Sequence, residues 1–202
     1  MLIEGLILGI IIGILRGGSL SNLVHQRIRY MSLVFVALFL QLGLDYAASQ
    51  QILLARLVLP LHAFSYVLLF SFIFLNWDLP GMKWFAVGTA LNFLVIVFNQ
   101  GTMPVNLDKL GSDLVATLEQ GLNATHSIMG EDTRLNLLGD SIYLPYPRAR
   151  RISPGDILLS IGLFLFLLKS MTVKFIYKIH TTRGITLAPY SLKTGKKNDK
   201  IK

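Results

Sequence analysis

The sequence contains no cysteine, and only 15% of its 202 residues are charged. Without cysteine the chain can form no disulfide, use no thiolate and hold no cysteine-ligated metal or iron–sulfur cluster. About a quarter of the residues in an ordinary soluble domain are charged. The charged side chains here are therefore too few to cover the surface of a soluble protein of this length.

Apolar residues make up 53% of the chain, and most of them fall into five segments. A helix needs about 20 mostly apolar residues to cross a hydrocarbon core of about 30 Å. We therefore expect an all-α integral membrane protein with five transmembrane helices. The five segments are residues 1–15, 30–48, 52–75, 82–98 and 156–179. The first segment is short, but we expect a retained helix, because its arginine follows the apolar run instead of preceding it.

The basic residues predict an orientation. Placing alternate connections on opposite sides puts thirteen of the 19 lysines and arginines on the side of the C-terminus and six on the other. Because basic residues favour the cytoplasmic side, we expect a membrane protein with its N-terminus outside and its C-terminus in the cytoplasm; the membrane itself, a bacterial cytoplasmic (inner) membrane, is implied by the family resemblance described below. Residues 1–179 would form the membrane domain and residues 180–202 a basic tail. Contact with the lipid bilayer then accounts for most of the net charge of +8, and no nucleic-acid partner is expected.

The connection between the fourth and fifth segments, residues 99–155, is too long for a simple linker in a compact protein. Leucines recur in it at helical spacing, with charged residues between them. This pattern is typical of an amphipathic helix on a membrane surface, which we predict over about residues 106–122. The fold class is therefore five transmembrane helices with an amphipathic outer loop between the fourth and the fifth.

Glycines recur at every fourth residue of the first segment, in the pattern of a glycine zipper. The residues are Gly5, Gly9, Gly13 and Gly17. Such a face lets another helix approach closely. The partner is either a helix of the same chain or another membrane subunit, and the sequence leaves both open.

Three polar residues lie within the apolar segments. His62 is two residues from Pro60, and ionisable groups at that depth are functional candidates. The alternative is that a neutral His62 donates a hydrogen bond to a backbone carbonyl freed by the proline. Gln41 and Asn92 are predicted to form hydrogen bonds between helices in preference to binding a ligand.

The outer loop and the start of the fifth helix hold most of the remaining polar candidates. These are Asn99, His126, Arg134, Asp140 and Asp156. A histidine with carboxylates can run acid–base chemistry or bind a metal. Their spacing matches no metal or catalytic motif, so we assign no catalytic residue and no metal ligand, and no cofactor is indicated.

Simpler roles exist for several of these residues. Asp156 follows Ser153 and suits the first turn of a helix, and Asp140 follows Gly139 as in a turn. An outer basic cluster, Arg148, Arg150 and Arg151, is either a site for a phosphate or lipid headgroup or a solvated surface.

Several motifs of this region resemble a family of bacterial multi-span integral-membrane proteins of unknown function. The similar elements are Asn-Gln-Gly-Thr-Met-Pro-Val at 99–105, His126, Thr-Arg-Leu at 133–135, Leu-Leu-Gly-Asp-Ser-Ile-Tyr-Leu-Pro at 137–145 and Ser-Pro-Gly-Asp-Ile-Leu at 153–158. The resemblance covers roughly residues 1–168. It implies a bacterial membrane protein whose outer loop carries its distinguishing residues, and it implies no activity.

The sequence is compatible with three functions. Our first hypothesis is a non-catalytic subunit or accessory protein of a membrane assembly, which would bind other subunits through the first helix. The second is a small-molecule or lipid binding or transport component, with residues such as Gln41, His62, Tyr66, Asn92 and Asn99 converging on an enclosed polar cavity near the outer leaflet. The third is an outward-facing enzyme on a lipid-linked substrate, which requires His126 and Asp140 to lie within about 10 Å of each other.

Overall fold

The computed structural model describes residues 2–52, 55–146, 149–172, 175–177 and 189–191. Arg148 and all but residues 189–191 of the predicted basic tail lie outside the described residues. The described chain is mostly helical. The helices are α1 Leu2–Leu15, α2 Ser21–Val24, α3 Ser32–Ser49, α4 Ala55–Leu75, α5 Met82–Phe98, α6 Ser112–Glu119 and α7 Pro154–Thr172.

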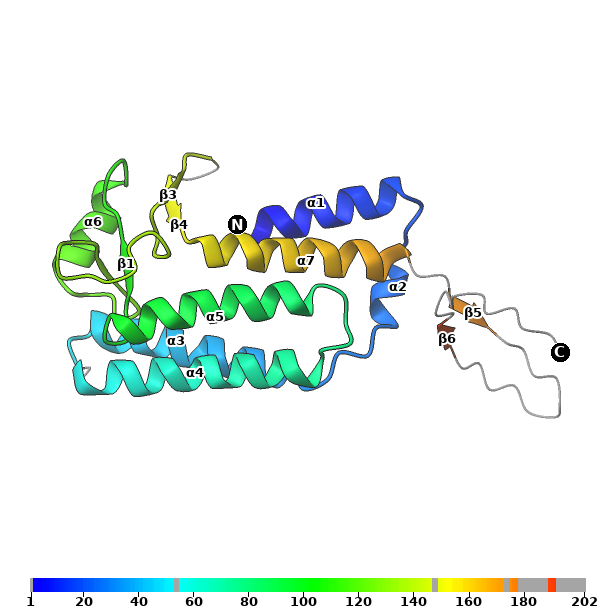
Figure 1. Cartoon of the computed structure of the whole chain (residues 1–202), viewed down its shortest axis with the longest axis horizontal. Helices are drawn as coiled ribbons and strands as arrows, with labels where there is room; N and C mark the ends of the chain where they lie inside the picture. The colour runs from blue at the N-terminus through cyan, green and yellow to red at the C-terminus, as the bar shows by residue number, and fades with distance from the viewer. Residues whose placement is uncertain (1, 53–54, 147–148, 173–174, 178–188, 192–202) are drawn as a thin grey trace, which may run out of the picture.

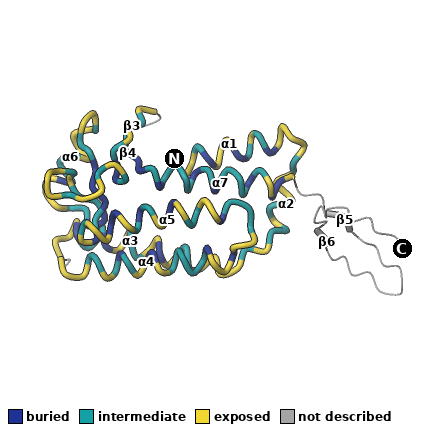
Figure 2. The backbone as a smooth tube through the Cα atoms, viewed as in Figure 1, coloured by how far each residue is buried: buried dark blue, intermediate teal, exposed yellow. Residues whose placement is uncertain are grey.

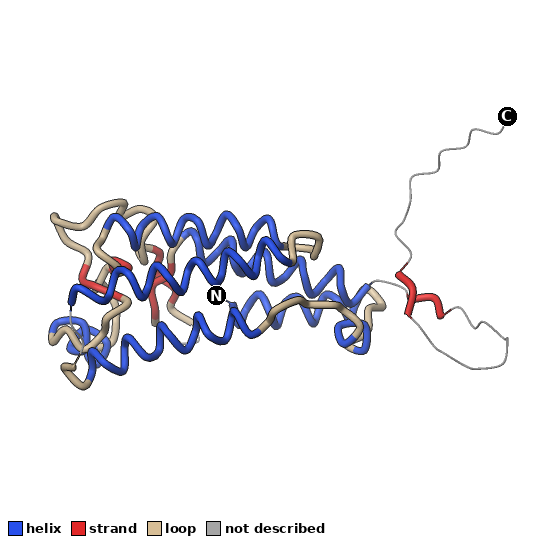
Figure 3. Tube along the Cα trace, turned by 90° about the horizontal axis from the view of Figure 1, so that it is seen from below, coloured by secondary structure: helices blue, strands red, loops and turns tan. Residues whose placement is uncertain are grey.

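The described strands form three short pairs. They are the parallel pair β1 Met103–Val105 and β2 His126–Ile128, and the antiparallel pairs β3 Ile142–Leu144 with β4 Arg150–Ile152 and β5 Phe175–Tyr177 with β6 Pro189–Ser191. Figure 1 shows the long helices side by side, with β1 to β4 and α6 gathered at one end. Figure 3, turned by 90°, places these strands at the same end. We call residues 99–153, which connect α5 to α7, the cap.

The apolar helices indicate a membrane protein. Three of them, α3, α4 and α7, are long and apolar enough to cross a membrane, with 18, 21 and 19 residues. The other two, α1 and α5, are apolar but have only 14 and 17 residues, or about 21 and 26 Å of helix. The predicted count of five spans is therefore not confirmed. Exposed residues recur along the long helices (Figure 2), and large apolar ones such as Phe39 are among them.

The glycine face of α1 packs on α7 of the same chain. A Cβ atom on Gly5 would lie 2.7 Å from the Ser160 carbonyl oxygen, and one on Gly13 would lie 2.7 Å from the Met171 sulfur. Gly9 likewise faces α7. Gly17 does not belong to this face: it lies in the turn after α1 with a φ of +75°, and a Cβ there would meet nothing within 4 Å.

The predicted interfacial helix is shorter than expected. It covers Ser112–Glu119 instead of residues 106–122. Lys109, with a φ of 62°, and Gly121, with a φ of 65°, adopt the left-handed conformation on either side of it. Such residues interrupt a right-handed helix, and leucine spacing alone does not reveal them.

The close approach of α1 to α7 predicts opposite effects for two glycine substitutions. Gly5→Ala should lower the free energy of unfolding by about 1–3 kcal/mol, because the added Cβ overpacks against backbone. Gly43→Ala is the matched control, since Gly43 is also helical but a Cβ there meets nothing within 4 Å. It should be neutral or stabilising by up to about 1 kcal/mol. Melting temperatures in one detergent would test this, and a Gly5→Ala variant that melts no lower than wild type would contradict it.

Candidate functional site

Asp45, near the end of α3, holds the cap against the helices. Its carboxylate accepts the backbone N–H of Ala124 at 3.0 Å, the N–H of Thr125 at 2.9 Å and the Thr125 hydroxyl at 2.9 Å. These bonds place His126, the first residue of β2, over the ends of the helices. Neither Asp45 nor Thr125 stands out as a functional residue in the sequence, where the only signal is a carboxylate within an apolar segment.

His62 of α4 makes a second link to the cap. Its Nδ1 donates to the Gly101 carbonyl at 2.6 Å, so its Nε2 is left as an acceptor. The predicted acceptor type, a backbone carbonyl, is correct, but it comes from the cap and not from the carbonyl freed by Pro60 on α4 itself. Gly101 has a φ of +101°, and a Cβ there would lie 2.7 Å from the Leu59 Cα, so only glycine fits this contact.

Strand β1 brings together two distant cap segments. On one side it pairs with β2, where Met103 is opposite His126. On the other side Val105 forms a bridge with Asp140, and the Asp140 N–H donates to the Pro104 carbonyl at 2.9 Å. The segments that carry His126 and Asp140 therefore flank the same three-residue strand.

The side chains of His126 and Asp140 lie close to each other. Their Nε2 and Oδ2 atoms are 3.8 Å apart. On the other side of the ring, Nδ1 lies 2.9 Å from the Thr125 hydroxyl oxygen, which also bonds Asp45. Because the Thr125 hydroxyl has one proton and gives it to Asp45, His126 donates from Nδ1, and its Nε2 faces Asp140 with a lone pair.

Burial sets the charge of this pair. It raises the pKa of Asp140 to about 8, with a further contribution from the charge of Asp156. Burial also lowers the pKa of His126. The His126 side chain is 41% exposed, and its residue lines two cavities at this end of the protein. At neutral pH a protonated Asp140 therefore lies beside a neutral His126.

A polar cavity of about 130 Å³ lies between the cap and the helices. Helices α3, α4, α5 and α7 and the cap all contribute to its lining. The lining residues are Gln41, His62, Tyr66, Asn92, Ile96, Met103, Thr125, His126, Asp140 and Asp156. The structure thus joins the predicted polar residues of the helices to three of the predicted candidates from the outer loop and the start of the last helix.

Two of the cavity residues, Asn92 and Asp156, also support the start of α7. Ser153 and Asp156 form a capping box, in which the Asp156 N–H donates to the Ser153 Oγ at 3.0 Å and the Ser153 N–H donates to the Asp156 Oδ2 at 3.3 Å. Asn92 donates to the Asp156 Oδ1 at 3.1 Å and accepts from the Ser153 hydroxyl at 2.9 Å. Gln41 donates to the Ser65 hydroxyl at 2.9 Å. Both amides therefore bond between helices, as predicted.

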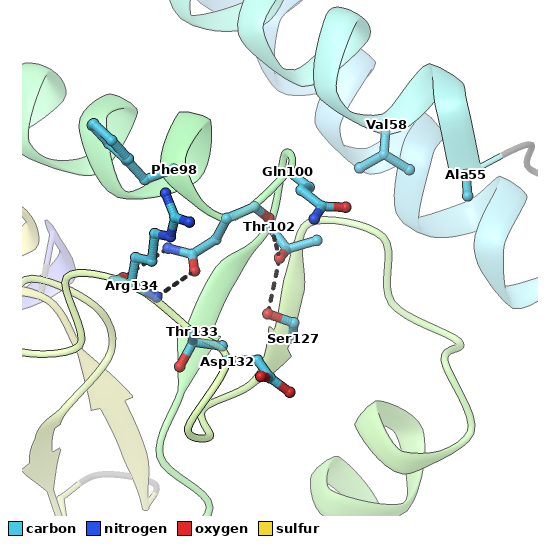
Figure 4. A pocket seen from close by; sticks show the side chains of 10 residues that line it. Ala55, Val58, Phe98, Gln100, Thr102, Ser127, Asp132, Thr133 and Arg134 are labelled. Atoms are coloured by element: carbon cyan, nitrogen blue, oxygen red, sulfur yellow. Dashed lines mark hydrogen bonds between the residues drawn. The ribbon is translucent and has the colours of Figure 1, made fainter.

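Asn99 and Arg134 lie elsewhere, at an open hollow of about 560 Å³. The Asn99 side chain accepts from the Arg134 N–H and donates to the Arg134 carbonyl, both at 2.8 Å (Figure 4). Thr102 and Ser127 are joined beside them by a hydrogen bond of 2.8 Å. The predicted outer candidates therefore occupy two places, and the His126–Asp140 pair belongs to the smaller, more enclosed one.

The described arginines of the basic cluster already have protein partners. Arg150 forms an ion pair with Glu4 at the start of α1. Arg151 donates to the carbonyls of Asp108 and Ser141, both at 2.6 Å, and lies over the Tyr143 ring. Within the described part of the chain, no three His, Asp or Glu side chains come close enough together to hold a metal ion.

The apolar helices and the cavity beneath the cap define a helical protein of membrane type with a polar site at one end of its helices. The chain belongs to a family described as a family of unknown function (DUF5317), which matches residues 25–168. It is also 31% identical, over 168 residues, to an uncharacterised protein of Thermotoga maritima. That match covers 82% of this chain and 89% of the relative. No solved structure matches. Every residue that lines the cavity lies within the family match.

The raised pKa of Asp140 predicts how stability depends on pH. Between its ordinary pKa of 3.8 and about 8, the folded protein keeps a proton that the unfolded chain releases. Stability should therefore be highest at low pH within this window and fall as pH rises, by at most about 1.4 kcal/mol per unit from this group. Asp140→Asn cannot titrate, so the difference in melting temperature between pH 5 and pH 8 should shrink.

Asp113→Asn, which changes an exposed carboxylate on α6, is the control for this experiment and should keep the wild-type pH dependence. Equal pH dependence in wild type and Asp140→Asn would show that Asp140 does not hold the proton.

Proposed function

We propose that this protein binds a small molecule or a lipid headgroup in the cavity beneath the cap, as a binding or transport component of a bacterial cytoplasmic membrane. In this proposal the cap lies on the outer side. One observation carries it: the cap lies over the ends of four helices and forms a polar cavity with them. A solid apolar interior would have left no such site.

The cavity fits a group of a few heavy atoms. Its volume of about 130 Å³ corresponds to about four water molecules at roughly 30 Å³ each. His62 and His126 both direct Nδ1 toward protein acceptors, so each ring presents Nε2 as an acceptor. With a protonated Asp140 beside them, the lining offers both donors and acceptors, which favours a ligand that forms directed hydrogen bonds.

The accessory-subunit hypothesis is less well supported by this geometry. It rested on the glycine face of α1, and Gly5, Gly9 and Gly13 all pack on α7 of the same chain. Contact with another subunit stays a prediction, and it would have to use a different surface.

The second candidate function is an enzyme that acts on a lipid-linked substrate. It is favoured by the separation of 3.8 Å between the His126 Nε2 and the Asp140 Oδ2, well inside the 10 Å that cooperation requires. An unprotonated imidazole nitrogen beside a protonated carboxyl group is an arrangement suited to acid–base catalysis. Asp156 lines the same cavity but is also committed to the capping box of α7.

The binding proposal predicts a ligand that copurifies with the protein. Protein extracted from bacterial membranes in a mild detergent should carry a discrete small-molecule or lipid adduct in native mass spectrometry. His126→Gln removes the basic ring nitrogen and should reduce occupancy about fivefold, the equivalent of one hydrogen bond worth about 1 kcal/mol.

The matched control is His25→Gln, which changes a histidine that follows α2 at the other end of α7 (Figure 1). It should leave the adduct unchanged. The binding proposal fails if wild-type protein carries no adduct, or if the two histidine variants lose it equally.

A further inference from the structure

A second cavity, of about 450 Å³, lies beside the polar site, and we call it the side cavity. It shares His126, Asp140 and Asp156 with the smaller cavity. Its other walls come from the first turn of α1 and from β4, including Arg150. The side cavity therefore lies next to the candidate site, with walls from the start of α1, from β4 and from the start of α7.

An apolar groove of about 320 Å³ lies between α1 and α7. Its walls include Leu8, Ile161 and Phe164. The groove and the side cavity are neighbours, because Glu4 lines the groove, Arg150 lines the side cavity, and the two side chains form an ion pair. The Arg150–Glu4 ion pair lies where the polar cavity meets the apolar groove.

The surroundings of the groove identify its occupant. Helices α1 and α7 are apolar and lie side by side, and Leu8 is 52% exposed on the groove. Within a bilayer an apolar groove on such a surface faces acyl chains, so its occupant is a lipid chain whose polar end lies at the ion pair.

The charges at the polar end identify the headgroup. Arg150 suits a phosphate, but a headgroup with a phosphate alone would also meet the carboxylates of Glu4 and Asp156. An ammonium group on the same headgroup offsets that repulsion. A carboxylate has about four acceptor positions, so Asp156 can accept from an ammonium while it keeps its bonds to Asn92 and Ser153.

We infer that the ligand is a phospholipid with a phosphate and a primary ammonium group, which enters from the bilayer between α1 and α7. Its acyl chain lies in the apolar groove, its phosphate lies beside Arg150, and its ammonium group reaches Asp156 at the edge of the inner cavity. This inference rests on the proposed binding function and adds the class of ligand and its route.

Lipid retention in nanodiscs would test the inference. The protein is placed in phosphatidylcholine discs that contain a minor fraction of either phosphatidylethanolamine or phosphatidylglycerol, and the lipid retained after extraction is measured by native mass spectrometry. Phosphatidylethanolamine should be retained about tenfold more than either other lipid, because only its headgroup combines a phosphate with an ammonium that donates hydrogen bonds. Arg150→Gln should reduce this retention.

Two variants on the same helix separate the groove from the general surface of α1. Leu8→Trp fills the groove and should lower phosphatidylethanolamine retention about tenfold. Ile7→Trp is the matched control, since Ile7 is 49% exposed and does not line the groove, and it should have no effect. Melting temperatures report folding, and Ile161→Trp blocks the groove from its opposite wall if Leu8→Trp does not fold.

Equal retention of the three lipids, or equal effects of Leu8→Trp and Ile7→Trp, would overturn the inference. If His126→Gln loses a water-soluble adduct while Leu8→Trp keeps it, the binding function stands and the lipid route is wrong. If wild-type protein retains nothing in either assay, both proposals fail.

Discussion

The candidate site depends on the attachment of the cap to the helices, and the Asp45 carboxylate is central to that attachment. A carboxylate at the end of an apolar helix is costly unless it is bonded, and two backbone N–H groups and one hydroxyl bond it here. The same bonds fix Thr125, and the Thr125 hydroxyl in turn accepts from His126. One ionic group thus positions the segment and also selects the tautomer that leaves the His126 Nε2 facing the cavity.

On the side of α1 and α7, close packing of helices adds to hydrogen bonds and an ion pair. Gly5 and Gly13 let α1 lie directly on α7, and Glu4 then comes within reach of Arg150 on β4. Asn92 joins α5 to the capping box of α7. Hydrogen bonds therefore join the walls of the site on α5 and α7, whereas α1 contacts the cap through the Glu4–Arg150 ion pair.

The sequence predicted the helices far better than the site. Apolar runs identified the five apolar helices, and single amides in such runs correctly predicted interhelical bonds for Gln41 and Asn92. The meeting of His126 and Asp140 could not be predicted, because it depends on β1, a strand of three residues that is too short to show any alternation. Similarly, the predicted interfacial helix is interrupted at Lys109 by a left-handed backbone conformation. No residue pattern predicts such a conformation at a lysine.

Burial also decides which charges a ligand would meet. Because burial raises the pKa of Asp140 and lowers that of His126, the pair is uncharged at neutral pH. The fixed negative charge that remains at the cavity is Asp156, which the N-terminus of α7 stabilises. The Asp156 carboxylate would repel an anion in the inner cavity. With an uncharged ligand, the same carboxylate would be paired only with neutral donors such as Asn92. A cation joined to an anion, with the anion lying farther out at Arg150, matches the charges of Asp156 and Arg150, so the proposed zwitterionic ligand is consistent with a neutral His126–Asp140 pair.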